Sequence, residues 1–256
     1  MTKPLALFGL AGIASGPIAV GLLHVMPPTD RIDPVRRTIS EYALHETAWL
    51  FNAGVLALAA GSLAVLAALA RVGVTRLNSL GGLGLLLWCV GLAAIVYFPK
   101  HNWAVGPSGH GTVHRAASLV AFVSLPLGAL LIAWAWRRDG AWRGRALFTA
   151  GFAVLALLLF GIIAGAVALQ PFTGVRWWQA IPLGVVERAL ATAEICVALT
   201  LGWWALTGAM SPPADGDIDA QAAQENDPHH GEKDPQHDLA ALRPLPVVHD
   251  ATEGRP

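Results

Sequence analysis

The feature that most constrains the fold is a set of six long apolar segments, each as long as a helix that crosses a lipid bilayer. A span needs about 20 mostly apolar residues, and the segments that meet this requirement are residues 4–25, 47–70, 79–98, 113–136, 147–169 and 182–207. Only 13% of the residues are charged, whereas an average soluble domain has about 25%. The sequence therefore predicts an all-α, six-helix transmembrane bundle.

Charge divides the chain into two parts. Residues 1–210 carry fourteen Lys and Arg against seven Asp and Glu, whereas residues 211–256 carry three against ten. The second part is rich in Pro, Asp, Gln and His, so it cannot bury enough apolar surface to offset the entropy lost on ordering. We expect a six-span transmembrane domain over residues 1–210 and a disordered, acidic, cytoplasmic C-terminal tail over residues 211–256.

Short basic connections predict the orientation in the membrane. The connection 137–145 has the densest cluster of Lys and Arg, which the positive-inside rule places in the cytoplasm. With six spans both termini are then cytoplasmic, and the connections 26–46, 99–113 and 170–181 face the other side of a bacterial cell membrane. The expected partner is the lipid bilayer, with a small-molecule or lipid ligand and no nucleic acid.

Two spans contain glycines four residues apart: Gly12 and Gly16 in the first, and Gly161 and Gly165 in the fifth. Small residues at this spacing allow helix backbones to approach closely in lipid. The pattern permits tight helix packing at these places, although such pairs also arise often by chance in apolar spans.

The most polar short stretch between two apolar segments is residues 34–44. Thr38 and Glu41 have the spacing of a capping box, in which a hydroxyl and a carboxylate satisfy free amides at a helix start. The spacing predicts a helix that begins here and continues into the second span. Arg36 and Arg37, just before it, need water, a lipid phosphate or a carboxylate. They are either interfacial anchors or one wall of a binding site.

Acidic, basic and imidazole side chains gather on this same side of the predicted bundle. Glu187 and Arg188 open the sixth span, and Glu194 lies two helical turns deeper on the same face. Ionisable groups at such depth indicate function unless they are protonated and hydrogen-bonded to a neighbouring helix. At the span ends we expect arginines and carboxylates to pair with each other. The predicted ligand-binding residues are Arg37, Glu41, His114, Glu187, Arg188, Glu194 and His24.

Two histidine pairs suggest weaker hypotheses. His110 and His114 are four residues apart and could hold a metal with a third, carboxylate ligand, although the Glu of a zinc-protease helix is missing between them. His24 and His114 could ligate a haem. The leading hypothesis remains non-enzymatic: binding or moving a small molecule or lipid, or serving an envelope partner, without a cofactor. The alternatives are a membrane-embedded, metal-dependent hydrolase and a haem redox protein.

The motif Asp33-Pro34-x-x-Arg37-Thr38-Ile39-Ser40-Glu41-Tyr42 resembles the signature of domain-of-unknown-function family 998, a group of bacterial and archaeal multi-pass membrane proteins. His114 at the head of the fourth span and Glu187-Arg188 at the head of the sixth are similar to that family's layout. The resemblance covers residues 5–207 and implies a six-span helical bundle, but no activity or catalytic residue. The chain departs from the pattern after the third span, where Lys100 replaces the usual acidic residue.

Overall fold

The structure is a computed structural model that describes residues 2–102 and 104–210. Within these residues six helices are long and apolar enough to cross a membrane: α1 (Thr2–Leu23), α2 (Ala48–Arg71), α3 (Leu80–Tyr97), α4 (Gly109–Trp136), α5 (Arg143–Thr173) and α7 (Leu183–Gly208). The connections contain the short α6 (Trp177–Ala180) and two 3₁₀ helices, η1 (Thr29–Arg31) and η2 (Ile39–Leu44). The prediction of an all-α fold with six spans is confirmed. The predicted tail lies outside the described residues.

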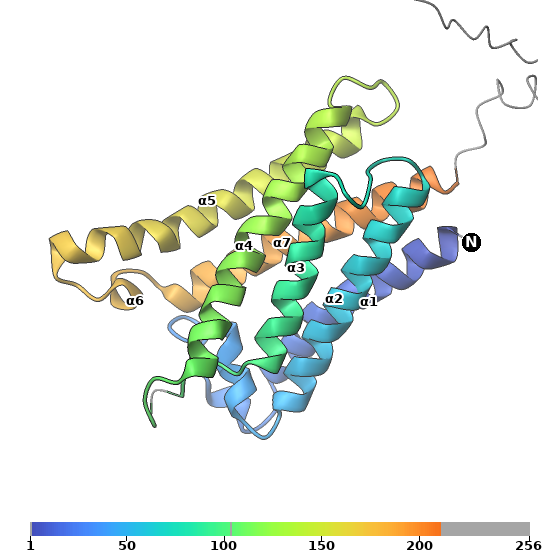
Figure 1. The fold of residues 1–256 in the computed structure, drawn as a ribbon. Coiled ribbons are helices and arrows are strands. Elements are labelled where there is room, and N and C mark those ends of the chain that lie inside the picture. The colour runs from blue at the N-terminus through green and yellow to red at the C-terminus, as the bar shows by residue number, and fades with distance from the viewer. Residues whose placement is uncertain (1, 103, 211–256) are drawn as a thin grey trace, which may run out of the picture. The chain divides into compact units, whose positions relative to one another are not determined.

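The long helices form a bundle in which α7 packs against four of the other membrane-length helices. α1 packs beside α2, and α3 packs beside α4 (Figure 1). α7 contacts α1, α2, α4 and α5. Although α5 packs on α4 and α7, only 17% of its membrane-length window is buried, against 56% for α2. α5 therefore presents the largest share of its surface to lipid, and α7 is well placed to carry residues into the interior.

Glycines explain the close approach of α1 and α2. A Cβ built on Gly61 would lie 2.6 Å from the carbonyl oxygen of Gly9, and a Cβ on Gly12 would lie 2.9 Å from the Cα of Gly61. No side chain fits at these distances, so the first glycine motif provides the close packing that its spacing permits. A Cβ built on Gly161 or Gly165 would have no described atom of another helix within 4 Å. The second motif therefore makes no helix contact in this part of the chain.

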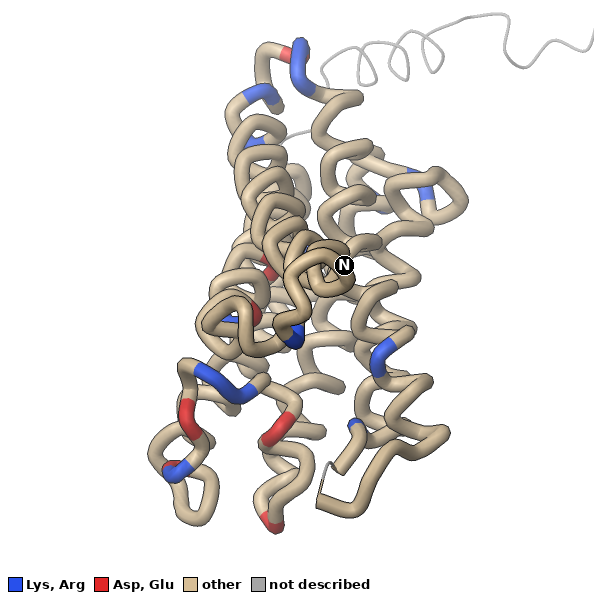
Figure 2. Tube along the Cα trace, turned by 90° about the vertical axis from the view of Figure 1, so that its left-hand side faces the viewer, with Lys and Arg blue, Asp and Glu red and all other residues tan. Residues whose placement is uncertain are grey.

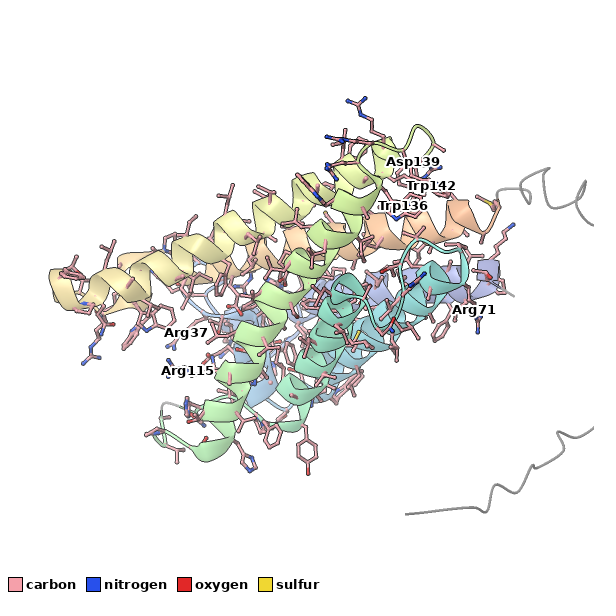
Figure 3. The ribbon with its side chains drawn as sticks, turned by 45° about the horizontal axis from the view of Figure 1, so that its top comes forward. Arg37, Arg71, Arg115, Trp136, Asp139 and Trp142 are labelled. Carbon is pink, nitrogen blue, oxygen red and sulfur yellow. The ribbon has the colours of Figure 1, made fainter. Side chains whose placement is uncertain are left out.

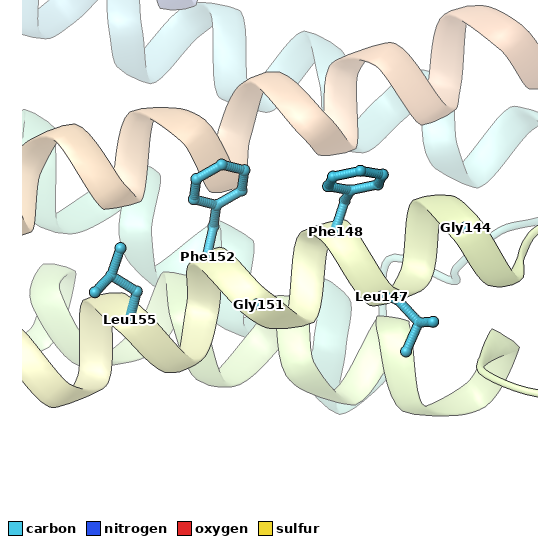
Figure 4. A pocket seen from close by; sticks show the side chains of 6 residues that line it. All are labelled: Gly144, Leu147, Phe148, Gly151, Phe152 and Leu155. Carbon is cyan, nitrogen blue, oxygen red and sulfur yellow. The ribbon is translucent and has the colours of Figure 1, made fainter.

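An open apolar groove runs along the first half of α5 (Figure 4). One helix supplies all of its lining residues, which are Gly144, Leu147, Phe148, Gly151, Phe152 and Leu155. Binding sites for polar ligands need a few polar groups that fix orientation. Because these side chains are all apolar, the groove suits lipid chains and is not a candidate catalytic or polar-ligand site.

The two ends of the bundle differ in character. The short-loop end carries the connections 72–79 and 137–142, and there Arg71 and Asp139 lie with two tryptophans (Figure 3). The long-loop end carries the connections 24–47, 98–108 and 174–182, and there Arg37 and Arg115 lie (Figure 3). Acidic and basic residues are mixed at the long-loop end (Figure 2). The candidate site is built from this end.

Candidate functional site

The connection between α1 and α2 folds over the long-loop end instead of extending α2. The 3₁₀ helix η2 starts after Thr38, and α2 begins only at Ala48. Thr38 makes no side-chain capping bond; its hydroxyl accepts a hydrogen bond from Lys100 Nζ at 2.8 Å, and Glu41 Oε2 accepts another from the same ammonium at 2.8 Å. The predicted capping box, with its helix continuing into the second span, is therefore wrong. A charged donor from a distant connection is a stronger partner for both oxygens than a backbone amide.

Lys100, the third residue after the end of α3 at Tyr97, lies at the centre of the charged groups. In its ion pair with Glu41 the side chains are 13% and 21% exposed, respectively. Its charge also acts on Glu187 and on His114. On the other side of Glu41 the guanidinium of Arg37 lies 4.0 Å from the carboxylate, with its side chain 61% exposed. Two cations, one half-buried and one exposed, thus flank a single carboxylate.

The first turns of α7 provide a seat for the folded connection. The backbone N–H of Gly184 donates to the carbonyl oxygen of Val35 at 2.9 Å, and Glu187 Oε2 accepts the N–H of Ile39 at 3.1 Å. The carbonyl oxygen of Pro34 passes so close to Gly184 that a Cβ would not fit. Amides at a helix start have no partner within the helix. Here the connection supplies one, which anchors it to the bundle.

Arg188 holds this connection with its whole guanidinium. Nη1 donates to the carbonyl oxygens of Arg37 at 2.7 Å and Pro34 at 3.0 Å. Nη2 donates to the hydroxyl of Tyr42 at 3.2 Å, and Nε donates to His24 Nε2 at 3.1 Å. The planar guanidinium presents several donors in a fixed fork. Since carbonyl, hydroxyl and imidazole groups accept these bonds, Arg188 acts as a hydrogen-bonding clamp rather than as half of an ion pair.

His24 completes the clamp just after the end of α1. Its Nδ1 lies 2.7 Å from the carbonyl oxygen of Val20, while Nε2 accepts the bond from Arg188. A carbonyl only accepts and a guanidinium only donates, so this arrangement requires the proton on Nδ1. The ring packs on fully buried Tyr42, with centroids 5.4 Å apart. With both nitrogens engaged, His24 offers no lone pair to a haem iron.

His114 and His110 have different surroundings although they lie one turn apart on α4. His114 is buried, and its Nδ1 lies 2.9 Å from the carbonyl oxygen of Phe98 and 3.2 Å from that of Ile95. It thereby closes the end of α3, whose last carbonyls have no helical partner. His110 is exposed and packs edge-on against Phe98. In the described part of the chain no group of three or more His, Cys, Asp or Glu could hold a metal.

The structure brings most of the predicted ligand-binding residues to one place. The expected pairing of an arginine with a carboxylate occurs for Arg37 and Glu41 but not for Arg188. Arg37, Glu41, Glu187, Arg188 and His24 all lie around the folded connection, and His114 lies within reach of the Lys100 charge. Glu41 pairs with Lys100 and not with Arg188, whose donors go largely to the backbone. Glu194 lies apart, deeper in α7. Ligand binding by these residues stays a prediction.

Sequence reasoning did not single out Lys100 and Tyr42 as members of the cluster. Tyr42 is fully buried and contacts both His24 and Arg188. The signal for Tyr42 was its place at the end of the Thr38–Tyr42 motif. The signal for Lys100 was a lone cation directly after the third span, at the same membrane level as Glu41.

Comparison with known protein families gives a match over most of the chain. A family model described as "Protein of unknown function (DUF998)" matches residues 10–204. The matched region contains the whole cluster from His24 to Arg188 and most of the six spans. No curated protein and no solved structure matches the chain.

Proposed function

Since the chain belongs to the DUF998 family of proteins of unknown function, its activity has to be inferred from its own geometry, and we propose that this multi-pass membrane protein binds an anionic group at the long-loop end. The anion is the phosphate or carboxylate of a small molecule or of a lipid headgroup. Arg37 and Lys100 bind it, and Glu41 holds the two cations in position.

The observation that carries this proposal is the unequal balance of charge around Glu41. The carboxylate has Lys100 at 2.8 Å and Arg37 at 4.0 Å. The guanidinium of Arg37 makes no hydrogen bond within the described residues and is largely exposed. Glu41 and Glu187 are two carboxylates against the three cations Arg37, Lys100 and Arg188, so the exposed Arg37 side keeps donors for an additional anion. A guanidinium suits phosphate and carboxylate because its paired N–H groups match two oxygens.

The level of the cluster in the membrane fits a headgroup. Lys100 follows the end of α3 and Glu41 precedes the start of α2, so both lie where the spans leave the apolar core. Lipid phosphates occupy this interface, and long basic side chains commonly extend to it. A soluble phosphate ester reaching the same end offers the same chemistry, so the test has to separate the two sources.

Binding should appear as an increase in thermal stability of the full-length protein. We expect phosphatidylglycerol in mixed micelles to raise the melting temperature relative to phosphatidylcholine, because a ligand that binds only the folded state adds about 2.7 kcal/mol at 100 times its Kd. Arg37→Gln should remove most of this increase. Arg36→Gln is the matched control, because Arg36 is the exposed neighbour of the same charge and does not contact Glu41.

Glycerol phosphate added to phosphatidylcholine micelles distinguishes the sources. An increase with glycerol phosphate alone assigns the site to a soluble anion. An increase with phosphatidylglycerol alone assigns it to a headgroup. Equal losses in Arg36→Gln and Arg37→Gln would contradict the site and leave only general charge attraction. Equal melting temperatures of the wild-type protein in all lipids would also contradict the site.

We also propose that the long-loop end faces away from the cytoplasm, with both termini of the six-span domain on the cytoplasmic side. The support is the basic connection 137–145, which contains four Arg against Asp139, since short connections rich in Lys and Arg stay in the cytoplasm. Single cysteines at Ala141 and at Gly106, in a background where Cys89 and Cys196 are Ser, report the sides. In intact cells a membrane-impermeant thiol reagent should label Gly106→Cys and not Ala141→Cys. The reverse pattern would place the site inside the cell.

A further inference from the structure

Glu194 is a buried carboxyl in the middle of a span. It is 1% exposed, and its Oε1 has no hydrogen-bond partner among the described residues. Buried polar groups in native proteins nearly always have a partner. A purely structural protonated Glu194 would be hydrogen-bonded to a neighbouring helix, and the described residues show no such bond. This side chain therefore calls for another explanation.

The surroundings of Glu194 on α7 are apolar on both sides. Within the turn before it, Leu190 and Ala193 belong to an apolar cluster shared with α4 and α5. One turn after it, Val197 and Ala198 belong to the main core of the bundle. An ionised carboxylate without a partner is costly in such a place, whereas the neutral acid is tolerated. The position thus favours a carboxyl that has bound a proton.

Other charged groups around α7 lie toward the two ends of the bundle. The ionisable side chains of α7 and of the elements packed against it are Lys3 of α1, Arg71 of α2, Glu41 and Tyr42 of η2, His110, His114 and Arg115 of α4, Arg143 and Arg145 of α5, and Glu187, Arg188 and Cys196 of α7 itself. Those of α1, α2 and α5 lie toward the short-loop end, and those of η2 and α4 toward the long-loop end. Within the described residues none forms an ion pair with Glu194.

One carboxyl connects Glu194 with the long-loop end. Glu187 precedes it by seven residues, which puts both on one face of α7 with about 10 Å between them along the axis. Glu187 is half-buried and reaches the folded connection through Ile39. We propose that Glu194 is a proton-binding site inside the membrane, which exchanges its proton with the long-loop end along the Glu187 face of α7. This goes beyond the anion site and does not depend on it.

The exchange balances without any redox partner. The O–H bond of neutral Glu194 breaks, and water that enters transiently along the Glu187 face takes up the proton. The water then passes a proton to the carboxylate of Glu187, from which it goes to solvent. A proton returning by the same route forms the O–H bond again. The ligand of the site is thus the proton alone, and Glu187 is a positioning and relay group.

Infrared spectroscopy of the full-length protein in lipid tests the site directly. A neutral buried carboxyl gives a C=O stretching band separate from that of carboxylates. We expect this band in the wild-type protein and its loss in Glu194→Gln, which keeps the shape of the side chain. In D₂O the band should shift as the proton exchanges for deuterium. A band that Glu194→Gln does not change, or one that never shifts, overturns the proposal.

The route is tested by the rate of that shift. Glu187→Gln should slow the exchange at least about tenfold, because an amide does not relay the proton as a carboxylate does. The amide oxygen of Gln can still accept the N–H of Ile39, so the seat of the connection is kept. Glu46→Gln makes the same charge change in an exposed side chain of the same connection, away from the Glu187 face, and should leave the rate unchanged. Unchanged exchange in Glu187→Gln, or equal slowing in both variants, overturns the route.

Discussion

Replacing Arg188 with Gln should lower the free energy of unfolding by about 2–3 kcal/mol and release the connection between α1 and α2. The guanidinium bonds the carbonyl oxygens of Pro34 and Arg37, the Tyr42 hydroxyl and His24. A single bond from a charged donor contributes about 1.5–3 kcal/mol, but two of these acceptors are exposed and can turn to water. The expected loss is therefore smaller than the sum of the bonds.

The measurement is thermal melting in detergent together with limited proteolysis of residues 26–46. Arg188→Lys separates charge from shape, because an ammonium keeps the charge but cannot present the guanidinium fork. We expect Arg188→Lys to show most of the loss in free energy of unfolding that Arg188→Gln shows. Arg115→Gln is the control, because Arg115 is an exposed arginine at the same end. Wild-type melting and an intact connection in Arg188→Gln would show that the clamp does not hold the fold.

Replacing Gly61 with Ala should destabilise the bundle by about 2–3 kcal/mol, because overpacking a tight contact costs about 1–3 kcal/mol and backbone atoms cannot rotate away. The added Cβ would lie 2.6 Å from the oxygen of Gly9 and 2.7 Å from the nitrogen of Ile13. α1 and α2 would have to move apart along their whole contact. We expect a melting temperature lower by roughly 5 °C or more.

Gly165→Ala provides the matched control. It is the same substitution in the same kind of motif, at a position where the added Cβ would have no described atom of another helix within 4 Å. Alanine favours the helix more than glycine does, so the melting temperature should stay the same or rise slightly. A loss in Gly165→Ala equal to that in Gly61→Ala would mean that α5 is packed in solution against something outside the described residues, such as a second copy.

The spans could be predicted because each depends on a local property. A run of about 20 apolar residues has to be helical in lipid, where every backbone N–H and C=O must be satisfied within the segment. Each predicted span overlaps a long helix, although α4 begins at Gly109 and α5 at Arg143, four residues earlier than expected. At Gly109 the preceding Ser108 caps the helix by accepting the N–H of Gly111. The residue at which such a helix begins depends on single contacts of this kind, which the length of an apolar run does not predict.

The polar cluster shows where local patterns were insufficient. Thr38 and Glu41 have the spacing to satisfy each other's amides, but both bond Lys100, about sixty residues away. Arg188 has charged groups nearby, but its donors bond the carbonyl oxygens of Pro34 and Arg37. In each case several partners were chemically suitable. The folded path of the connection decided which one came within reach.

The sequence by itself determined the all-α class, the six spans, the family resemblance and the side of the bundle on which acids, bases and imidazoles gather. Those properties follow from composition and spacing along the chain, and they hold whatever the helices touch. The tertiary structure alone decided that Gly12 packs against Gly61 while a Cβ on Gly165 would contact no other described helix, and that Lys100 lies at the centre of the ion pairs. It also decided that Glu194 has no hydrogen-bond partner within the described residues. These facts depend on which helix packs against which. A contact involves two segments, so its energy cannot be inferred from the sequence of either segment alone.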